Sequence, residues 1–314
     1  MRNRVWRQPV TAWFRGLNQL WVEGNTDRIF CWVKDEQADW VQAERERWRR
    51  IREQQDEREL KPLKGETRIQ VIREEEAAVE QIKMEVLVHH RYLSTVAGHF
   101  LEQEEVNGYR LQLEEGANGW EISHCEQNRE RASDAGKTWS YYHPPEEHVS
   151  SRSGYDRMRA VQYAETWWNG HNPRYAKFAD DCTNYISQCL HAGGIPMEFT
   201  MRRDRGWWYK GSRDNWSYSW TVAHSFHNYL AGGGNAQARP VGSPGELNLG
   251  DVICYDWDGN GRWQHNTIVT AIDPAGMPLV NSHTVDSRHR YWDCRDSYAW
   301  TPRTKYRFFQ IGNS

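Results

Sequence analysis

The spacing of apolar residues is helical over the first sixty residues of the chain. The segment 35–60 is rich in Glu, Arg and Gln and carries only a thin apolar stripe, which consists of Trp40, Val41, Trp48 and Ile51. Such a stripe indicates a helix with one buried edge, and charged residues four positions apart can form ion pairs along the rest of its surface. We therefore expect a largely solvated helix here in preference to a nucleic-acid-binding face.

Between residues 67 and 125 the pattern changes to alternation of apolar and polar positions, clearest from Ile82 to Val88. Alternation is typical of half-buried strands. The pair Asn107-Gly108 predicts a hairpin turn, because both residues accept the left-handed backbone of a type I′ turn, and the Gly-Ala-Asn-Gly run at 116–119 predicts another. Helices followed by an antiparallel meander indicate a small accessory domain over residues 1–130.

The rest of the chain divides by composition. Residues 131–154 are charged and centred on Pro144-Pro145, which indicates a linker, and residues 155–314 are expected to form a second domain. Its most strongly marked helix begins after Asp180 and Asp181, which are good N-cap residues, and ends at Gly193-Gly194. The apolar face of this helix consists of Tyr185, Ile186, Cys189 and Leu190.

Cys182 lies in the first turn of that helix. Unpaired amides and the helix dipole favour a thiolate there, whereas the two neighbouring carboxylates oppose it, so the thiol would still need a base. The simpler interpretation of Cys182 is a small buried residue, because free cysteine is often buried. A histidine and an amide further along the chain favour the interpretation of Cys182 as a catalytic nucleophile.

That histidine is His265, which opens a predicted strand running to residue 271. The Asp-Pro-Ala-Gly turn at 273–276 folds the next strand, 278–284, back along it, and this places Asn281 and His283 within one or two rungs of His265. In a cysteine hydrolase Cys182 would attack an amide carbonyl, His265 would accept the thiol proton, and Asn281 would orient the imidazole. His283 fits this third place as well.

Composition limits the partners and the compartment. The 314 residues carry a net charge of −3, so no basic field indicates nucleic acid or a membrane. The basic N-terminal stretch is followed by no continuous apolar run, so we expect neither a signal peptide nor a membrane span, and a cytoplasmic location, with export or release by another route left open. Six widely spaced cysteines indicate free thiols, and we expect no metal and no other cofactor.

The order of motifs from about residue 155 to 311 resembles the "putative amidase domain" family of bacteria, which belongs with the papain-like cysteine hydrolases, near the NlpC-type and CHAP cell-wall peptidases. The resemblance is carried by Asp-Cys-Thr-Asn-Tyr-Ile-Ser-Gln at 181–188, Gly-Asp-Val-Ile at 250–253, His265, and Val-Asn-Ser-His-Thr at 280–284. It implies Cys182 as nucleophile, His265 as base, and peptidoglycan-type peptides as substrates.

We therefore expect an α+β protein in which a papain-like (NlpC-type) cysteine hydrolase domain follows a small helix-plus-antiparallel-sheet domain. The expected activity is hydrolysis of amide bonds in peptide or peptidoglycan-derived substrates by a Cys182, His265, Asn281 triad. The alternative is a catalytically inactive papain-like module that binds peptide or glycan through an aromatic groove. That groove would be lined by Trp207, Trp208 and Trp220.

Overall fold

The computed structural model describes residues 6–24, 30–78, 80–117, 119–128, 154–211 and 215–312. The chain divides into two compact units, which are described one at a time: an N-terminal unit of residues 1–132 with 295–298, and a C-terminal unit of residues 133–294 with 299–314. The predicted linker, 131–154, lies outside the described residues except for Gly154. The domain limits expected from the sequence therefore remain a prediction.

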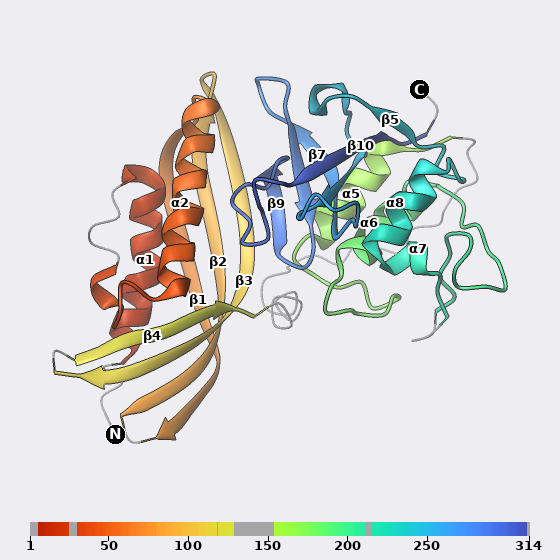
Figure 1. Ribbon diagram of the computed structural model, residues 1–314. Helices are drawn as coiled ribbons and strands as arrows, with labels where there is room; N and C mark the ends of the chain where they lie inside the picture. Colours follow the sequence, from red (N-terminus) through yellow and green to blue (C-terminus); the bar gives the residue numbers. More distant parts are fainter. Residues whose placement is uncertain are drawn as a thin grey trace. The chain divides into compact units, whose positions relative to one another are not determined.

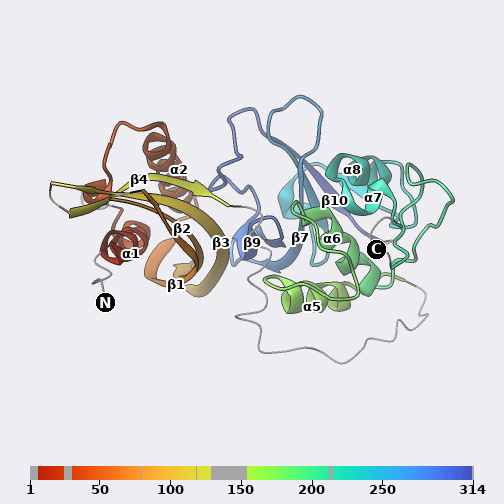
Figure 2. The same ribbon diagram turned by 90° about the horizontal axis from the view of Figure 1, so that it is seen from below.

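The N-terminal unit consists of helices followed by four long strands. Helix α1 (Arg7–Glu23), a short 3₁₀ turn η1 (Phe30–Trp32) and α2 (Asp39–Glu57) precede β1 (Lys61–Ala78), β2 (Gln81–Val96), β3 (His99–Gly116) and β4 (Gly119–Gln127). The strands form an antiparallel meander in chain order, and both helices lie against one face of it (Figures 1 and 2). The alternating apolar residues of β2 point into this core, where Met84, Val86 and Val88 are buried, as predicted.

The turn predicted at Asn107-Gly108 is wrong. Both residues lie in the middle of β3, where they pair with Val88 and Leu87 of β2. The chain reverses instead at Ala97-Gly98, which both have positive φ, 48° and 80°. Pairing two strands along their whole length outweighs the local turn preference of one dipeptide. The turn predicted at 116–119 is confirmed, since Gly116 pairs with Gly119 across it.

Helix α2 is less solvated than its composition indicates. On its outer side Arg49 pairs with Glu46 and Glu53, as expected for an exposed charged helix. On its inner side Glu44 and Arg47 are buried and form an ion pair with an Nη1–Oε1 distance of 3.3 Å. The burial of this charged pair was not expected. The pattern of apolar residues along a helix predicts which apolar side chains are buried, but it does not predict which charged side chains are buried.

The C-terminal unit places helices on one face of a six-stranded antiparallel sheet. Its helices are α5 (Arg157–Trp167), α6 (Cys182–Ala192), α7 (Tyr218–Thr221) and α8 (Ala223–Ala231). Its strands are β5 (Arg239–Val241), β6 (Val252–Asp256), β7 (His265–Ile272), β8 (Pro278–Ser282), β9 (Asp286–Tyr291) and β10 (Lys305–Gln310), with a 3₁₀ turn η2 (Pro244–Glu246) before β6. The sheet order is β9-β8-β7-β6-β10-β5.

The two faces of this sheet carry separate apolar clusters. Cys254 and Ile268 pack with Ile186 of α6 on one face, whereas Tyr255 and Val269 belong to the cluster on the other face. The fold is thus a mixed α/β arrangement with antiparallel sheet, and its papain-like character remains a prediction. None of the described helices is both long and apolar enough to cross a lipid bilayer.

Candidate active site around Cys182

Helix α6 is buried on nearly all sides, including its polar residues. Asn266 Nδ2 donates to Thr183 Oγ1 (2.9 Å), Trp220 Nε1 donates to Asn184 Oδ1 (3.0 Å), and Trp207 Nε1 donates to Ser187 Oγ (2.9 Å). The polar positions of the motif at 181–188 therefore hold β7, the Trp207 loop and helix α7 against α6. Such buried bonds are expensive to leave unmade, so this packing fixes the start of the helix.

The thiol of Cys182 lies at the first residue of α6 and is only 4 % exposed. Burial raises its pKa, and the charge of Asp180 adds to that rise. The backbone amide of Asn266 and the hydroxyl of Thr183, whose Oγ1 lies 3.7 Å from the Cys182 Sγ, act in the opposite direction, and the net pKa is raised. Cys182 is therefore a thiol at rest, surrounded by donors that would stabilise its thiolate.

His265 begins β7, next to the residue whose amide reaches the thiol. The side chain of Asn266 faces α6, so the side chain of its neighbour His265 points to the opposite face of the strand. Its ring lies against Tyr255 and Trp257, with ring centroids 5.5 and 5.8 Å away. The structure therefore brings the backbone beside His265 to Cys182, while the imidazole lies on the far face.

Asn281 is buried in a polar network away from His265. Its Oδ1 accepts hydrogen bonds from Thr270 Oγ1 (2.8 Å) and from the backbone amide of His289 (2.9 Å), and its Nδ2 donates to Glu165 Oε1 (2.9 Å). Both acceptor positions of Oδ1 are thus occupied, so the oxygen has no lone pair left to accept an imidazole N–H. The predicted orienting role of Asn281 does not fit this geometry.

Glu165 is the charged centre of that network. Burial would raise its pKa, but hydrogen bonds and charge from His289 and Arg288 outweigh burial and lower the pKa to about 2. Arg288 Nε lies 2.6 Å from Glu165 Oε2. Asn281 therefore helps to hold a carboxylate that ties α5 to the sheet.

His283 lies beside the start of α6, locked by two acceptors. Its Nε2 lies 2.7 Å from the Trp167 carbonyl oxygen, which can only accept, and its Nδ1 lies 2.8 Å from Asp181 Oδ2. The ring also stacks on Tyr185 at 3.9 Å. Burial would lower the pKa of His283, but the bond to Asp181 and the charges of Asp286 and Asp181 outweigh it, and the pKa is raised. Both nitrogens of His283 are therefore engaged with these two partners, which leaves no free nitrogen to take the proton of Cys182.

Sequence reasoning missed two acidic residues of this cluster. Asp181 was expected to cap α6, but its carboxylate makes no cap hydrogen bond and instead holds His283 and the side-chain amide of Asn184. Asp286 is buried beside them, and burial raises its pKa to about 7. In the sequence, Asp181 and His283 both lie in the segments that carry the family resemblance, 181–188 and 280–284. That resemblance does not show that the two side chains are in contact.

The aromatic groove of the alternative interpretation is not open. Trp207 and Trp220 are 0 % exposed and Trp208 is 4 % exposed. The indoles of Trp207 and Trp220 are hydrogen-bonded to α6, so these side chains are anchors of the core. Among the described residues, no group of three or more His, Cys, Asp and Glu side chains is placed to hold a metal ion.

Comparisons with known proteins find similarity over the C-terminal half of the chain. Residues 154–309 match the family model described as "Putative amidase domain". The chain is 57% identical over 158 residues to the uncharacterized protein YhbB of Bacillus subtilis, a match that covers 50% of each chain. It is 29% identical over 149 residues to the uncharacterized protein YjcM of the same organism, which covers 45% of this chain and 33% of that protein.

These matches concern only part of each protein, since the chain spans half or less of the length of the relatives it matches. No solved structure matches the chain. At this coarse level, residues 154–309 are similar to a family described as a putative amidase domain, a description that suggests hydrolysis of amides.

Proposed function

We propose that the protein is a cysteine-dependent amide hydrolase of the papain-like (NlpC) type, with Cys182 as the nucleophile and His265 as the general base. The observation that supports this most directly is the position of the Cys182 thiol at the start of α6, beside the Asn266 amide and 3.7 Å from the Thr183 hydroxyl. Donors around a buried sulfur lower the cost of forming its thiolate. The match of residues 154–309 to an amidase family points to the same chemistry.

His265 is favoured as the base because both ring nitrogens of His283 are already hydrogen-bonded within the protein. One nitrogen is bonded to Asp181 and the other to the Trp167 carbonyl. His265 stands at the first position of β7, where we infer that rotation of its side chain carries the imidazole past the strand end to the thiol. Catalytic hydrogen bonds are often long or misaligned in free enzymes and tighten when substrate binds.

The reaction then has two halves. His265 takes the proton of Cys182, and the thiolate forms a C–S bond to the amide carbonyl carbon. The developing oxyanion is met by backbone amides at the start of α6. The C–N bond breaks as the imidazolium protonates the leaving amine, and water, deprotonated by the same imidazole, then releases the acid from the thioester.

We propose peptide bonds of peptidoglycan as the substrate class. The support for this substrate is the resemblance to cell-wall peptidases, and the support for hydrolysis is the geometry around Cys182. The two parts of the proposal are therefore tested separately.

The experiment is digestion of purified peptidoglycan by the full chain, with mass spectrometry of the released fragments. Cys182→Ala should release none, while Cys31→Ser, a change at an exposed cysteine, should match the unaltered protein. His265→Ala should lower the rate about 10²- to 10⁴-fold, the usual contribution of a general base. Fragments released equally by Cys182→Ala would refute the mechanism. Peptidoglycan left intact, with Cys182-dependent cleavage of other amides, would refute only the substrate class.

A further inference from the structure

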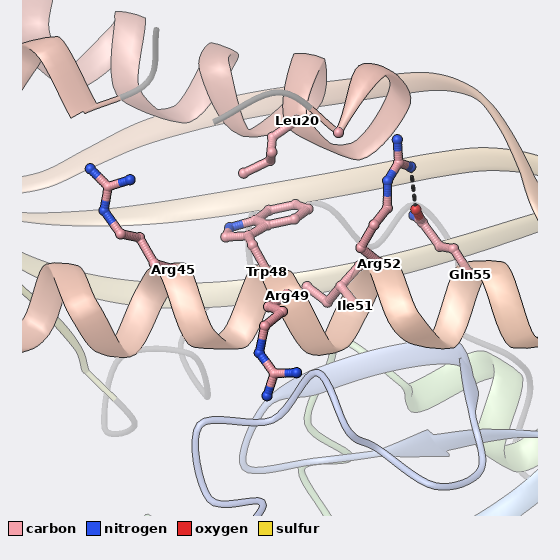
Figure 3. A pocket seen from close by; sticks show the side chains of 8 residues that line it. Leu20, Arg45, Trp48, Arg49, Ile51, Arg52 and Gln55 are labelled. Carbon is pink, nitrogen blue, oxygen red and sulfur yellow. Dashed lines mark hydrogen bonds between the residues drawn. The ribbon is translucent and has the colours of Figure 1, made fainter. Parts of the chain in front are cut away.

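A cavity of about 310 Å³ lies in the N-terminal unit, between α1 and α2. The mechanism proposed for amide hydrolysis does not involve this cavity. Its apolar lining consists of Leu20, Trp48 and Ile51, and its polar lining includes three arginines of α2 and Gln55. Figure 3 shows Leu20 above the Trp48 ring, with Arg52 and Gln55 together at one end. The cavity thus has an apolar middle and a polar end.

The apolar middle can accept only a nonpolar group. Leu20, Trp48 and Ile51 are each 4 % exposed, so they form a small apolar floor. The indole Nε1 of Trp48 already donates to Glu44 Oε1 at 2.7 Å, so no indole donor is left for a ligand. A polar group placed against this floor would lose its hydrogen bonds to water without replacement.

The polar end carries donors that lack an acceptor. Arg52 Nη1 donates to Gln55 Oε1 at 2.7 Å. Because a guanidinium can only donate, this bond fixes the amide oxygen of Gln55 toward Arg52. The Gln55 Nε2 has no hydrogen-bond partner although the residue is only 2 % exposed. An unpaired buried N–H costs free energy, and an acceptor oxygen from a ligand would remove that cost.

The positive charge of the cavity is concentrated at Arg52. Arg45 pairs with Glu36, and Arg49 pairs with Glu46 and Glu53. In the part of the chain that the structure describes, Arg52 has no carboxylate partner, and its hydrogen bond goes to the neutral Gln55. Gly24, with φ of 72°, leaves the space in which the Arg52 guanidinium lies, since a Cβ there would come within 2.0 Å of Nη2. The arrangement keeps a cation beside an apolar floor.

We propose that this cavity binds a small amphiphilic carboxylate, with its head on Arg52 and Gln55 Nε2 and its apolar group on the floor formed by Leu20, Trp48 and Ile51. At ~30 Å³ for a volume the size of one water molecule, the cavity holds roughly ten non-hydrogen atoms. Octanoate has this size. N-acetyl-leucine presents the same chemistry as the end of a peptide, so the two probes distinguish an acyl chain from a peptide terminus. The site is independent of amide hydrolysis.

The test is isothermal titration of the full chain with octanoate, N-acetyl-leucine, acetate and octyltrimethylammonium. Octanoate or N-acetyl-leucine should bind saturably at one site, and the tighter of the two identifies the source. Acetate lacks the apolar group and octyltrimethylammonium lacks the negative charge, so both should bind at least about tenfold more weakly. Equal binding of the cation, or no saturable binding of either carboxylate, would overturn the proposal.

Two variants locate the site, and a third controls for charge. Arg52→Met should weaken carboxylate binding about 10- to 100-fold, as expected when a charge-assisted hydrogen bond is lost. Gln55→Glu keeps the side-chain shape and supplies Arg52 with a carboxylate, so it should fold well and abolish binding. Arg91→Met removes an arginine of the same unit that pairs with Glu102 and does not line the cavity, and it should bind within about twofold of the unaltered protein. If Arg91→Met and Arg52→Met lost affinity equally, or if Gln55→Glu folded and still bound, the assignment would be wrong.

Discussion

Replacing Asn281 by alanine separates a structural role for this residue from the catalytic role that the sequence predicted. Asn281 is fully buried and makes three hydrogen bonds, to Thr270, to the backbone of His289 and to Glu165. Alanine leaves a hydroxyl and a backbone amide without their acceptor and removes one donor from a carboxylate. At about 1–3 kcal/mol for each unsatisfied buried group, Asn281→Ala should destabilise the C-terminal unit by about 3–5 kcal/mol.

Thr270→Val gives the matched comparison, because it removes only one of the three bonds. It should cost about 1 kcal/mol, since Asn281 Oδ1 keeps its bond from the His289 amide. The double variant should be about 1–2 kcal/mol more stable than the sum of the single effects predicts, because valine leaves no hydroxyl to be orphaned by the loss of Asn281.

Native-state hydrogen exchange of the β7 and β8 peptides, read by mass spectrometry, measures these changes in the C-terminal unit alone. An orienting residue of a catalytic triad would behave differently. Asn281→Ala would then lower the rate of amide hydrolysis strongly while leaving the opening free energy of β7 and β8 unchanged. That result would refute the network argument and restore the triad of Cys182, His265 and Asn281.

Three further outcomes follow from the charges and burial of the C-terminal unit. The lowered pKa of Glu165, from 4.5 to about 2, corresponds to about 3 kcal/mol of stability that is present above pH 4.5 and lost as the pH falls toward 2; Glu165→Gln should flatten acid unfolding over that range. The raised pKa of His283 contributes stability that is full below pH 6.5 and lost as the pH rises through its folded value; His283→Gln should remove this loss in a thermal melting series. In peptide mapping after brief iodoacetamide treatment at neutral pH, exposed Cys31 should be labelled before Cys182, and labelling of Cys182 should rise as the pH approaches its raised pKa.

The elements of the C-terminal unit were predictable because their signals are local. The apolar face of α6, the strand after Gly250 and the turn closed by the bond from the Gly276 amide to the Asp273 carbonyl each depend on residues close together in the sequence. The turn at Asn107-Gly108 failed because partner strands set the register of β3, and a dipeptide carries no information about its partner. The buried Glu44–Arg47 pair was missed because the apolar pattern of a helix does not show which of its charged residues are buried.

The roles predicted for Cys182, His265 and Asn281 remain predictions, and what the sequence could not supply is the number of hydrogen bonds that the polar residues near them already make. A sequence shows that Asn281 and His283 can each accept or donate, but it does not show that two donors already occupy the oxygen of Asn281. Nor does it show that two acceptors already hold the nitrogens of His283. Once these bonds are counted, neither residue is free to serve His265 or to take the proton of Cys182. Asn281 and His283 hold the helix and the sheet together through these bonds, and the mechanism that we propose assigns proton transfer to His265, the first residue of β7.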